Sequence, residues 1–419
     1  MEKLIFIFLL LTFNAFSLTF KSDGTVIKND GTIVESKISD NNQENPSIKK
    51  EKYLINQPGL IFIDGSDFIS NLKKFSPYVY YVCNDEGINT LELPNQNVDL
   101  SEWDSFEMDM EENQTLYFSS YCDHLANSDE NFDTFKYDLI ENINNGAYSK
   151  LTHLKDNSDL NYSHSINLIP LLLYYSFSKD DYSKEEQKKV ETWLYNLTIK
   201  HKKLFDSPNN HKFYYLNYAL AHSIVFDDAK IFNDTINDFR QTLSDAWTPE
   251  GFFKKEAERG SCALHYNYHS LNPIFGFLYN LKIQGIDLYK EKFFRNFDIN
   301  DIVDAIYEVT IDTSPLTKYS IKNNAGDTCV PGKGFSESVS KDPTIIYNMP
   351  QLGQNGWMLI YRDMFGEDKI EKFKKMEINN EKVMLFNSAK KNIGGPNNSL
   401  GGIPCIYFLT KDKNSCLAL

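Results

Sequence analysis

Arginine is scarce in this chain. Of 43 basic residues in 419, only Arg240, Arg259, Arg295 and Arg362 are arginines, and the rest are lysines. The guanidinium is a planar fork of donors that fits a carboxylate, whereas the lysine ammonium is a point charge. An arginine inside a polar motif therefore stands out as a candidate for specific recognition of an anion.

Net positive charge is also missing, since the formal charge is −15. This balance argues against nucleic acid and anionic membrane surfaces as partners. It also disfavours a polyanionic substrate unless a locally basic cleft exists. Lys212, Lys254, Lys255 and Arg259 are the residues that we expect to supply one. Surface acids farther away are screened beyond a Debye length of about 8 Å.

Long apolar runs are absent after the first residues. Residues 4–13 are apolar, follow Met1-Glu2-Lys3 and precede Ala15-Phe16-Ser17. This pattern predicts a secretory signal over residues 1–17. A membrane anchor is the alternative, disfavoured because the run is short and polar sequence follows. We expect a secreted protein, or one in a secretory compartment, with no membrane contact after signal removal.

Cysteines are few, and in an exported chain they predict disulfides. The six are Cys83, Cys122, Cys262, Cys329, Cys405 and Cys416. Fifteen full pairings are open, and proximity favours Cys405 with Cys416. Glycosylation sequons occur at Asn113, Asn161, Asn196, Asn233 and Asn397, and they matter only if the source glycosylates.

The composition changes along the chain. Residues 18–52 form a polar segment with two Asp-Gly-Thr turns, which suggests a small hairpin and a linker. From residue 53 to about 121, strands or irregular pieces (60–63, 78–82) alternate with a short helix (67–74). After Asp129 the pattern is helical as far as 393. The tail, 394–419, is rich in Gly, Pro and Asn and holds an apolar run that suggests a strand at 403–409.

Helical spacing dominates the middle of the chain. Ser183-Lys-Glu-Glu186 is a capping box that opens a helix. Further apolar faces lie at 232–246, at 271–281 before Gly285, at 299–309 and at 354–364. Short connections imply antiparallel neighbours, and no tight repeat supports a solenoid. The sequence therefore predicts a mostly α fold.

Three short motifs gather reactive side chains. They are Asn209-Asn210-His211, Glu256-Ala-Glu-Arg259 and Ala263-Leu264-His265-Tyr266. Together they supply an amide, an imidazole, a guanidinium and a phenol. These groups suffice to remove a proton from a carbon beside a carboxylate.

The segment 253–271 (FKKEAERGSCALHYNYHSL) and the stretch 284–288 (QGIDL) resemble the core signature of the alginate lyase family. The Asn-Asn-His tract is similar to that family's other signature, so the resemblance covers about 209–288. It implies an incomplete α/α toroid of antiparallel helical hairpins over residues 53–393, and β-elimination of a uronic-acid polysaccharide without a cofactor. Two departures concern substrate preference more than reaction type. Cys262 stands where some members carry a basic residue, and His265 precedes the tyrosine instead of following it.

Carried over by position, the catalytic set is Asn210, His211, Arg259 and Tyr266. Asn210 and Arg259 would neutralise the carboxylate as charge develops on it. Tyr266, with a phenol pKa near 10 that a nearby guanidinium would lower, would act as base and then as acid. His211 would be a second proton carrier or a further carboxylate donor.

The substrate-binding candidates are Tyr215, Tyr218, His265 and Lys255. His211, Tyr215, Tyr218 and His222 lie on one helical face, which lines a sugar groove or is ordinary core; both alternatives stay open.

Other polar residues near these motifs have plainer explanations. His265 and His269 have the i, i+4 spacing of zinc ligands, but no third ligand is evident, so no metal is expected. Glu256 is expected to orient Arg259, with plain surface charge as its alternative. Cys262 is expected to be structural, because no triad surrounds it.

The leading hypothesis is a secreted, monomeric polysaccharide lyase that acts on an alginate-like polyuronate. One alternative is a secreted carbohydrate-binding protein that kept the fold without turnover. Another is a glycoside hydrolase on a helical toroid, which needs two opposed carboxylates about 5 to 9.5 Å apart, and no convincing pair is evident.

Overall fold

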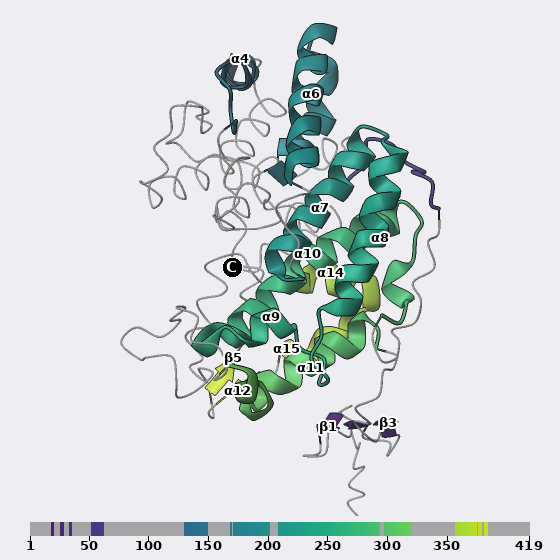
Figure 1. Cartoon of the computed structure of the whole chain (residues 1–419), viewed down its shortest axis with the longest axis vertical. Coiled ribbons are helices and arrows are strands. Elements are labelled where there is room, and N and C mark those ends of the chain that lie inside the picture. Colours follow the sequence, from purple (N-terminus) through teal and green to yellow (C-terminus); the bar gives the residue numbers. More distant parts are fainter. Residues whose placement is uncertain are drawn as a thin grey trace, which may run out of the picture.

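The computed structural model describes residues 18–20, 26–28, 33–35, 52–62, 130–149, 168–169, 171–201, 208–293, 297–320, 357–374, 376–378 and 381–383. The described part is mostly helical (Figure 1). Residues 168–169 and 171–178 are helical. The other helices are α4 (Glu130–Asn144), α6 (Lys184–His201), α7 (Asn210–Val225), α8 (Ala229–Asp245), α9 (Lys254–Ala257), α10 (Ala263–Ile283), α11 (Ile299–Ile311), α12 (Ser314–Ser320), α14 (Trp357–Phe365) and α15 (Glu367–Lys374).

Short elements complete the described chain. The 3₁₀ turns are η2 (Lys179–Asp181), η3 (Gly260–Cys262) and η4 (Leu288–Lys290). The strands β1 (Leu18–Phe20), β2 (Val26–Lys28) and β3 (Ile33–Glu35) pair antiparallel, in the region where a small hairpin was predicted. A second antiparallel pair, β4 (Met376–Ile378) and β5 (Glu381–Val383), was not predicted.

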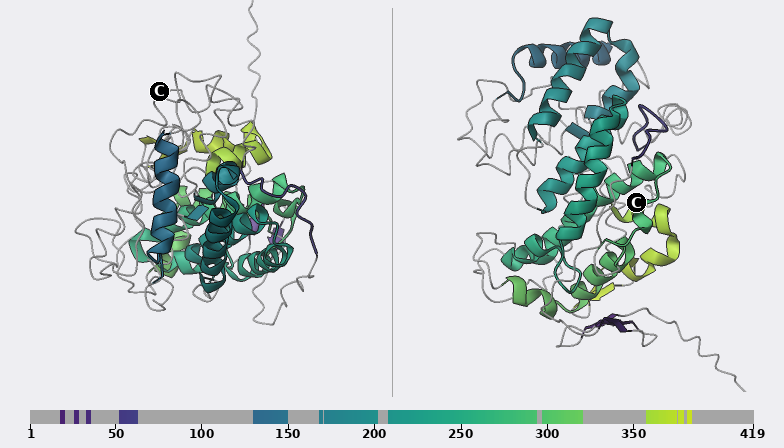
Figure 2. Two further views of the ribbon diagram at one scale, coloured as in Figure 1. Left: turned by 90° about the horizontal axis from the view of Figure 1, so that it is seen from above. Right: turned by 45° about the vertical axis from the view of Figure 1, so that its right-hand side comes forward.

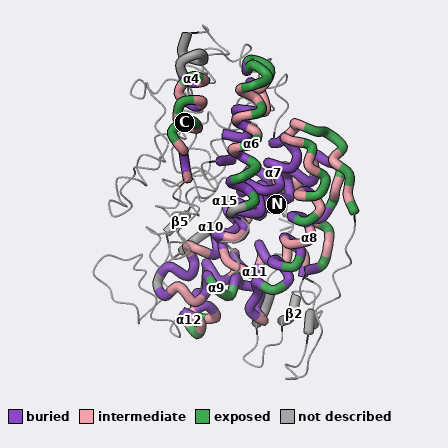
Figure 3. Tube along the Cα trace, turned by 45° about the horizontal axis from the view of Figure 1, so that its top comes forward, coloured by how far each residue is buried: buried purple, intermediate pink, exposed green. Residues whose placement is uncertain are grey.

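Helices α7 and α10 form the centre of the fold. Every residue of α7 except Lys212 is buried, and α10 is buried from Asn267 to Leu281. Helices that are apolar on all sides belong in the interior, and α7 and α10 pack against each other. Figure 3 shows α7 coloured as buried behind the more exposed α6 and α8. The short loop 226–228 turns the chain back into α8, so α7 and α8 form an antiparallel hairpin.

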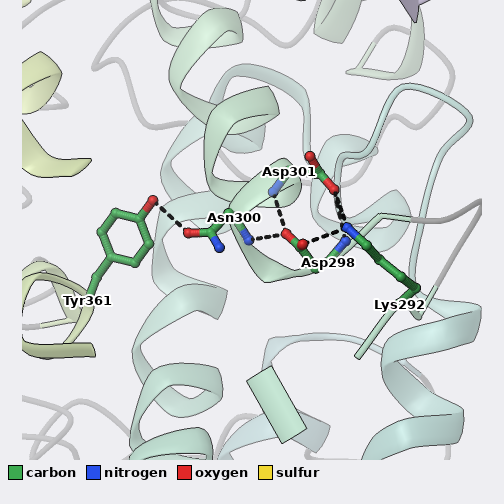
Figure 4. A network of polar contacts seen from close by, with 5 residues as sticks. All are labelled: Lys292, Asp298, Asn300, Asp301 and Tyr361. Atoms are coloured by element: carbon green, nitrogen blue, oxygen red, sulfur yellow. Dashed lines mark hydrogen bonds and ion pairs between the residues drawn. The ribbon is translucent and has the colours of Figure 1, made fainter. Parts of the chain in front are cut away.

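Aromatic and polar contacts join the other helices to this pair and to one another. Phe239 of α8 stacks on Phe277 of α10, with ring centroids 3.8 Å apart. Asp298 caps α11 in a reciprocal capping box with Asp301. Tyr361 of α14 contacts Asn300 beside that cap, with its hydroxyl 3.1 Å from the amide oxygen (Figure 4). Figure 2 shows α4 and α6 at one end of the molecule and α11 and α12 toward the other.

Several predicted helices are confirmed at close to their expected ends. The Ser183 N–H donates to the Glu186 carboxylate at 2.7 Å, and the Glu186 N–H donates to the Ser183 hydroxyl at 3.3 Å, so the capping box opens α6. Helix α10 ends before Gly285, whose φ of +79° is the left-handed conformation that favours glycine. Helix α14 (Trp357–Phe365) lies in the region of the helix predicted at 354–364.

Residues 60–62 are irregular, one of the two forms that were expected for this piece. Ile61 and Phe62 are nevertheless buried in the core. The predicted elements at 67–74, 78–82 and 403–409 lie outside the described residues, as do the signal segment and all cysteines except Cys262. No described helix has the length and apolarity that crossing a bilayer requires.

Side-chain amides fasten the segment 53–62 across α8 and α10. Asn233 exchanges hydrogen bonds with the backbone of Tyr53, at 2.7 and 3.0 Å, so the amide of this sequon is engaged within the fold. The Gln284 amide oxygen accepts the N–H of Gln57 at 2.8 Å, and the Asn280 amide oxygen accepts the N–H of Phe62 at 2.9 Å. Because Gln284 and Asn280 are fully buried, these contacts position the segment uniquely.

We predict that Gln284→Ala lowers the free energy of unfolding by about 1–3 kcal/mol, because it leaves buried backbone groups unpaired. The matched control is Gln241→Ala on the exposed face of α8, which should change stability by less than about 0.5 kcal/mol. Urea unfolding of both variants measures the difference. Equal stability of the two variants would show that the amide does not anchor the segment.

Candidate active site

The first turn of α7 presents two of the candidate residues. Asn209 caps the helix, and its side-chain oxygen accepts the N–H of Lys212 at 3.1 Å. Asn210 follows with no exposed surface, and His211 is 6 % exposed. Both amide atoms of the Asn210 side chain have no hydrogen-bond partner among the described residues. A buried amide in that state is a ready donor and acceptor for a ligand.

Glu256 connects this helix end to the second motif. Its carboxylate has no exposed surface and accepts the backbone N–H of Asn210 at 2.7 Å, across 46 residues of sequence. The backbone carbonyl of Glu256 accepts the N–H of Arg259 at 3.2 Å. Glu256 was expected to orient Arg259 through its carboxylate. The structure shows this carboxylate accepting the N–H of Asn210, so Glu256 fixes the position of the start of α7; its role in orienting Arg259 stays a prediction.

Arg259 lies over Tyr266 at the start of α10. The guanidinium carbon is 3.6 Å from the centre of the phenol ring, a close cation–π contact. Both side chains are half-buried. Stacking fixes the plane of the guanidinium and places a positive charge directly beside a phenol.

Three aromatic side chains extend the cluster along α10 and α7. The rings of His265 and His269, one helical turn apart, are stacked with centroids 6.0 Å apart. Tyr266 meets His265 edge to face, with centroids 4.9 Å apart. Tyr214 of α7 lies 5.2 Å from His269. The two helices therefore share one polar and aromatic surface.

Two histidines in this cluster are neutral at ordinary pH. Burial, reinforced by the charge of Arg259, lowers the pKa of His211 to about 3. Burial also holds the pKa of His269 well below its usual range, and the charges of His265, His211 and Arg259 act in the same direction. Both imidazoles are thus kept uncharged around one arginine. Such a site can bind an anion and still offer neutral imidazole nitrogens for proton transfer.

The structure brings the four predicted catalytic residues into one region. Asn210 and His211 are adjacent on α7, Arg259 acts electrostatically on His211, and Arg259 covers Tyr266. His265 flanks Tyr266 in a half-buried position. Lys255 is exposed at the edge of α9, with its ammonium 3.9 Å from the Glu258 carboxylate.

Two substrate-binding candidates are placed in the core instead. Tyr218 has no exposed surface; its hydroxyl accepts a hydrogen bond from Thr198 at 2.9 Å and donates to the Leu194 carbonyl at 3.3 Å. Tyr215 is 4 % exposed, and burial, assisted by Asp238, raises its pKa. This face of α7 is therefore a packing face against α6 at Tyr218, and we leave both tyrosines out of the proposed site.

One of the four residues expected to supply a basic cleft has its charge paired elsewhere. The ammonium of Lys212 is 2.9 Å from the Asp238 carboxylate on α8, so its charge is neutralised there. Cys262 is disulfide-bonded, which removes it as a nucleophile. No group of three or more potential metal ligands occurs among the described residues.

His269 and Tyr214 are members of the cluster that the sequence analysis did not assign. The i, i+4 spacing of His265 and His269 was noticed only as a zinc pattern. Tyr214 stands four residues after Asn210, which places it on the same helical face. That spacing was the available signal for both residues.

Comparison with known proteins supports the same region. The model of the family described as Alginate lyase matches residues 151–315. No curated protein sequence matches the chain. Among solved structures, alginate lyase A1-III from Sphingomonas species A1 aligns with a TM-score of 0.54 and 15 % identity, covering 76 % of this chain and 92 % of that one.

Two other solved structures of alginate lyase A1-III align equally well. A histidine-to-alanine variant complexed with a tetrasaccharide aligns with a TM-score of 0.55 and 15 % identity, covering 78 % and 92 % of the two chains. A tyrosine-to-phenylalanine variant complexed with a tetrasaccharide gives 0.54 and 15 %, covering 74 % and 89 %. At this identity the alignments show the fold, which is the predicted α/α toroid. The family match over residues 151–315 and the shared fold agree with the resemblance to the alginate lyase family seen in the motifs.

Proposed function

We propose that this protein cleaves an alginate-like polyuronate by β-elimination, with Asn210, His211, Arg259 and Tyr266 as the catalytic residues. The observation that carries the proposal is the Arg259 guanidinium stacked on Tyr266 beside the neutral His211. This arrangement brings together one positive charge that can bind an anion, on Arg259, and two groups that can carry a proton, Tyr266 and His211. That the related lyase variants are complexed with a tetrasaccharide is consistent with an oligosaccharide ligand for this fold.

The reaction begins at C5 of a uronate, next to the C6 carboxylate. A base removes the C5 proton, and negative charge accumulates on the carboxylate. The electron pair then forms the C4–C5 double bond while the C4–O4 bond breaks, and O4 takes up a proton. One product ends in a new reducing end, and the other begins with an unsaturated uronate at its non-reducing end. No water is consumed.

Charge on the carboxylate is the main barrier, and Arg259 and Asn210 are the residues that we propose to stabilise it. Preorganised donors aimed at developing charge are worth several kcal/mol, and removal of one such donor costs about 2.7–4 kcal/mol in a known case. The Arg259 guanidinium is held in a fixed plane by Tyr266. The buried Asn210 amide has both polar atoms without a partner in the described chain, so it can donate to a carboxylate oxygen.

Tyr266 is the proposed proton carrier, since its phenol lies directly beside the guanidinium of Arg259, the proposed partner of the carboxylate. The same oxygen can take the C5 proton and return it to O4 if both lie on one face of the sugar. His211 is neutral and can accept a proton or donate one N–H to the carboxylate. Secretion remains part of this proposal, supported by the pattern of residues 1–17; the monomeric state stays a prediction.

Incubation with polymannuronate, polyguluronate, glucuronan and glycosaminoglycans tests the function. We expect absorbance near 235 nm from the unsaturated product with at least one polyuronate. Tight binding without that chromophore would favour a non-catalytic carbohydrate-binding protein. Release of reducing ends without it would favour a glycoside hydrolase. Either result, or no response to any polymer, contradicts the proposal.

Tyr266→Phe should lower kcat by at least about 100-fold, because general acid or base catalysis contributes at least that factor. The variant keeps the ring that packs against Arg259 and His265. Tyr268→Phe is the matched control two residues along α10; its hydroxyl lies 2.7 Å from the Thr310 hydroxyl in the core. That control should lose about 1 kcal/mol of stability and keep its turnover. Full activity of Tyr266→Phe would exclude Tyr266 as the proton carrier.

Arg259→Lys should lower kcat more than it raises KM, since lysine keeps the charge but loses the planar fork and the stacking. Arg240→Lys is the control: Arg240 binds Glu291 with two nitrogens, at 2.8 and 2.9 Å, away from the site. It should lose stability and keep kcat. An unchanged kcat in folded Arg259→Lys protein would mean that Arg259 does not stabilise the transition state.

Glu256 is proposed as a positioning residue that acts through Asn210. Glu256→Gln keeps an oxygen that can accept the Asn210 N–H, so it should retain most of the turnover. Glu256→Ala leaves that buried N–H unpaired, and it should lose about 1–3 kcal/mol of stability and about tenfold in kcat. Steady-state kinetics on both variants separate the hydrogen bond from the charge. Equal losses in the two variants would show that the charge is what matters.

A further inference from the structure

A pocket lies at the opposite end of α7 from the candidate active site. It has a volume of about 570 Å³ and is lined by the middle of α6, the α7–α8 loop and residues 58–59. His222 lines it and follows His211 by eleven residues, which corresponds to about 16 Å along the helix axis. The pocket is therefore separate from Arg259 and Tyr266.

His222 is the polar group at the base of this pocket. It is 1 % exposed, and neither ring nitrogen has a hydrogen-bond partner among the described residues. Burial lowers its pKa to about 4, although the charge of Asp228 opposes the shift. The ring is thus neutral near pH 7, with one N–H donor and one acceptor nitrogen. Buried polar atoms without partners are costly, and a ligand in the pocket can pair them.

An aromatic ring stands beside this histidine. Tyr195 of α6 is 46 % exposed and lines the pocket, with its ring centroid 6.3 Å from that of His222. Phe226 closes the other side, 4.6 Å from His222. Ligand pockets typically combine such aromatic walls with a few placed polar groups. The two rings provide apolar faces for the carbon skeleton of a small ligand.

The charges at the pocket disfavour a uronate. Lys179 is the basic residue of the lining, against the carboxylates of Glu191, Asp227 and Asp228. Asp228 is occupied as the cap of α8, where it accepts the N–H groups of Lys230 and Ile231. One oxygen of Glu191 accepts the Tyr175 hydroxyl at 3.5 Å. Its other oxygen and the Asp227 carboxylate can accept from hydroxyl groups of a ligand, and both carboxylates would repel a carboxylate ligand.

We propose that this pocket is a second carbohydrate site, which binds a neutral saccharide unit by aromatic contact with Tyr195 and hydrogen bonds to His222. A neutral sugar ring offers hydroxyl donors to Glu191 and Asp227, hydroxyl acceptors to Lys179, and both kinds to the imidazole. Its C–H faces suit the exposed tyrosine ring. The inference goes beyond the proposed lyase reaction and does not depend on it, since no residue of the pocket belongs to the catalytic set.

Saturation-transfer NMR and calorimetric titration with methyl β-glycosides of glucose, galactose and mannose test the proposal on the full chain. We expect binding of at least one neutral glycoside, and weaker binding of methyl β-glucuronide. Tyr195→Ala should raise the dissociation constant by about threefold to tenfold, since aromatic contacts are worth that factor. Tyr137→Ala, at another exposed tyrosine on α4, should leave it unchanged.

Two further variants keep the test decisive. His222→Phe retains a ring for packing and removes both nitrogens, so the folded variant should lose the neutral glycoside. If it does not fold, the Tyr195→Ala and Tyr137→Ala pair decides alone. Arg259→Lys should bind the glycoside normally, and Tyr195→Ala should cleave polyuronate normally, so failure of this site is distinguishable from failure of the lyase proposal. No binding of any neutral glycoside, preference for the glucuronide or for a cationic amino sugar, or binding that is insensitive to Tyr195→Ala would overturn the inference.

Discussion

The buried hydrogen bond from the Asn210 N–H to the Glu256 carboxylate is the contact on which the site depends. At 2.7 Å and without solvent access, it joins the start of α7 to the turn that carries Arg259. A carboxylate at a helix N-terminus is also stabilised by the unpaired N–H groups and the dipole there. Without this hydrogen bond, the positions of the amide, the imidazole and the guanidinium relative to one another would depend on two segments that are far apart in sequence.

The positive charge of the candidate site comes mainly from Arg259. The chain carries a net charge of −15, and Lys212, the lysine nearest the site in sequence, is paired with Asp238. Arg259 acts on histidines that burial keeps neutral, so it does not compete with imidazolium charges for a bound anion. Because the region is half-buried, water screens this single charge less than at an open surface. A strongly acidic protein can therefore still present a carboxylate-binding site.

Local signals in the sequence were sufficient for several helix ends, whereas the catalytic candidates came from the family resemblance. The Ser183 capping box and Gly285 each determine a helix end through contacts within a few residues, so both were predictable. Tyr218 was ambiguous because helical spacing cannot distinguish a groove from a neighbouring helix; the difference is Thr198, twenty residues away on α6. Glu256 was expected to orient Arg259, but the hydrogen bond from its carboxylate to the Asn210 N–H, across 46 residues of sequence, was not expected. The contact of His269 on α10 with Tyr214 on α7 likewise depends on how the two helices pack, which no short motif encodes.

Helix α7 carries polar groups without described partners at both of its ends, although its middle is core. The first turn carries the Asn210 amide, and the last turn carries the His222 ring, which lines a pocket with more carboxylates than amines; neither side chain has a hydrogen-bond partner among the described residues. Between them, Phe213, Leu216 and Leu220 are fully or almost fully buried and give the helix its stability. The burial that stabilises α7 is also what makes its terminal polar atoms costly to leave unpaired. Under the two proposals above, the opposite charge at the two ends gives them different ligand preferences: an anionic sugar at Arg259 and an uncharged one at His222. One rigid helix can in this way fix two sites of different chemistry without a loop rearrangement at either.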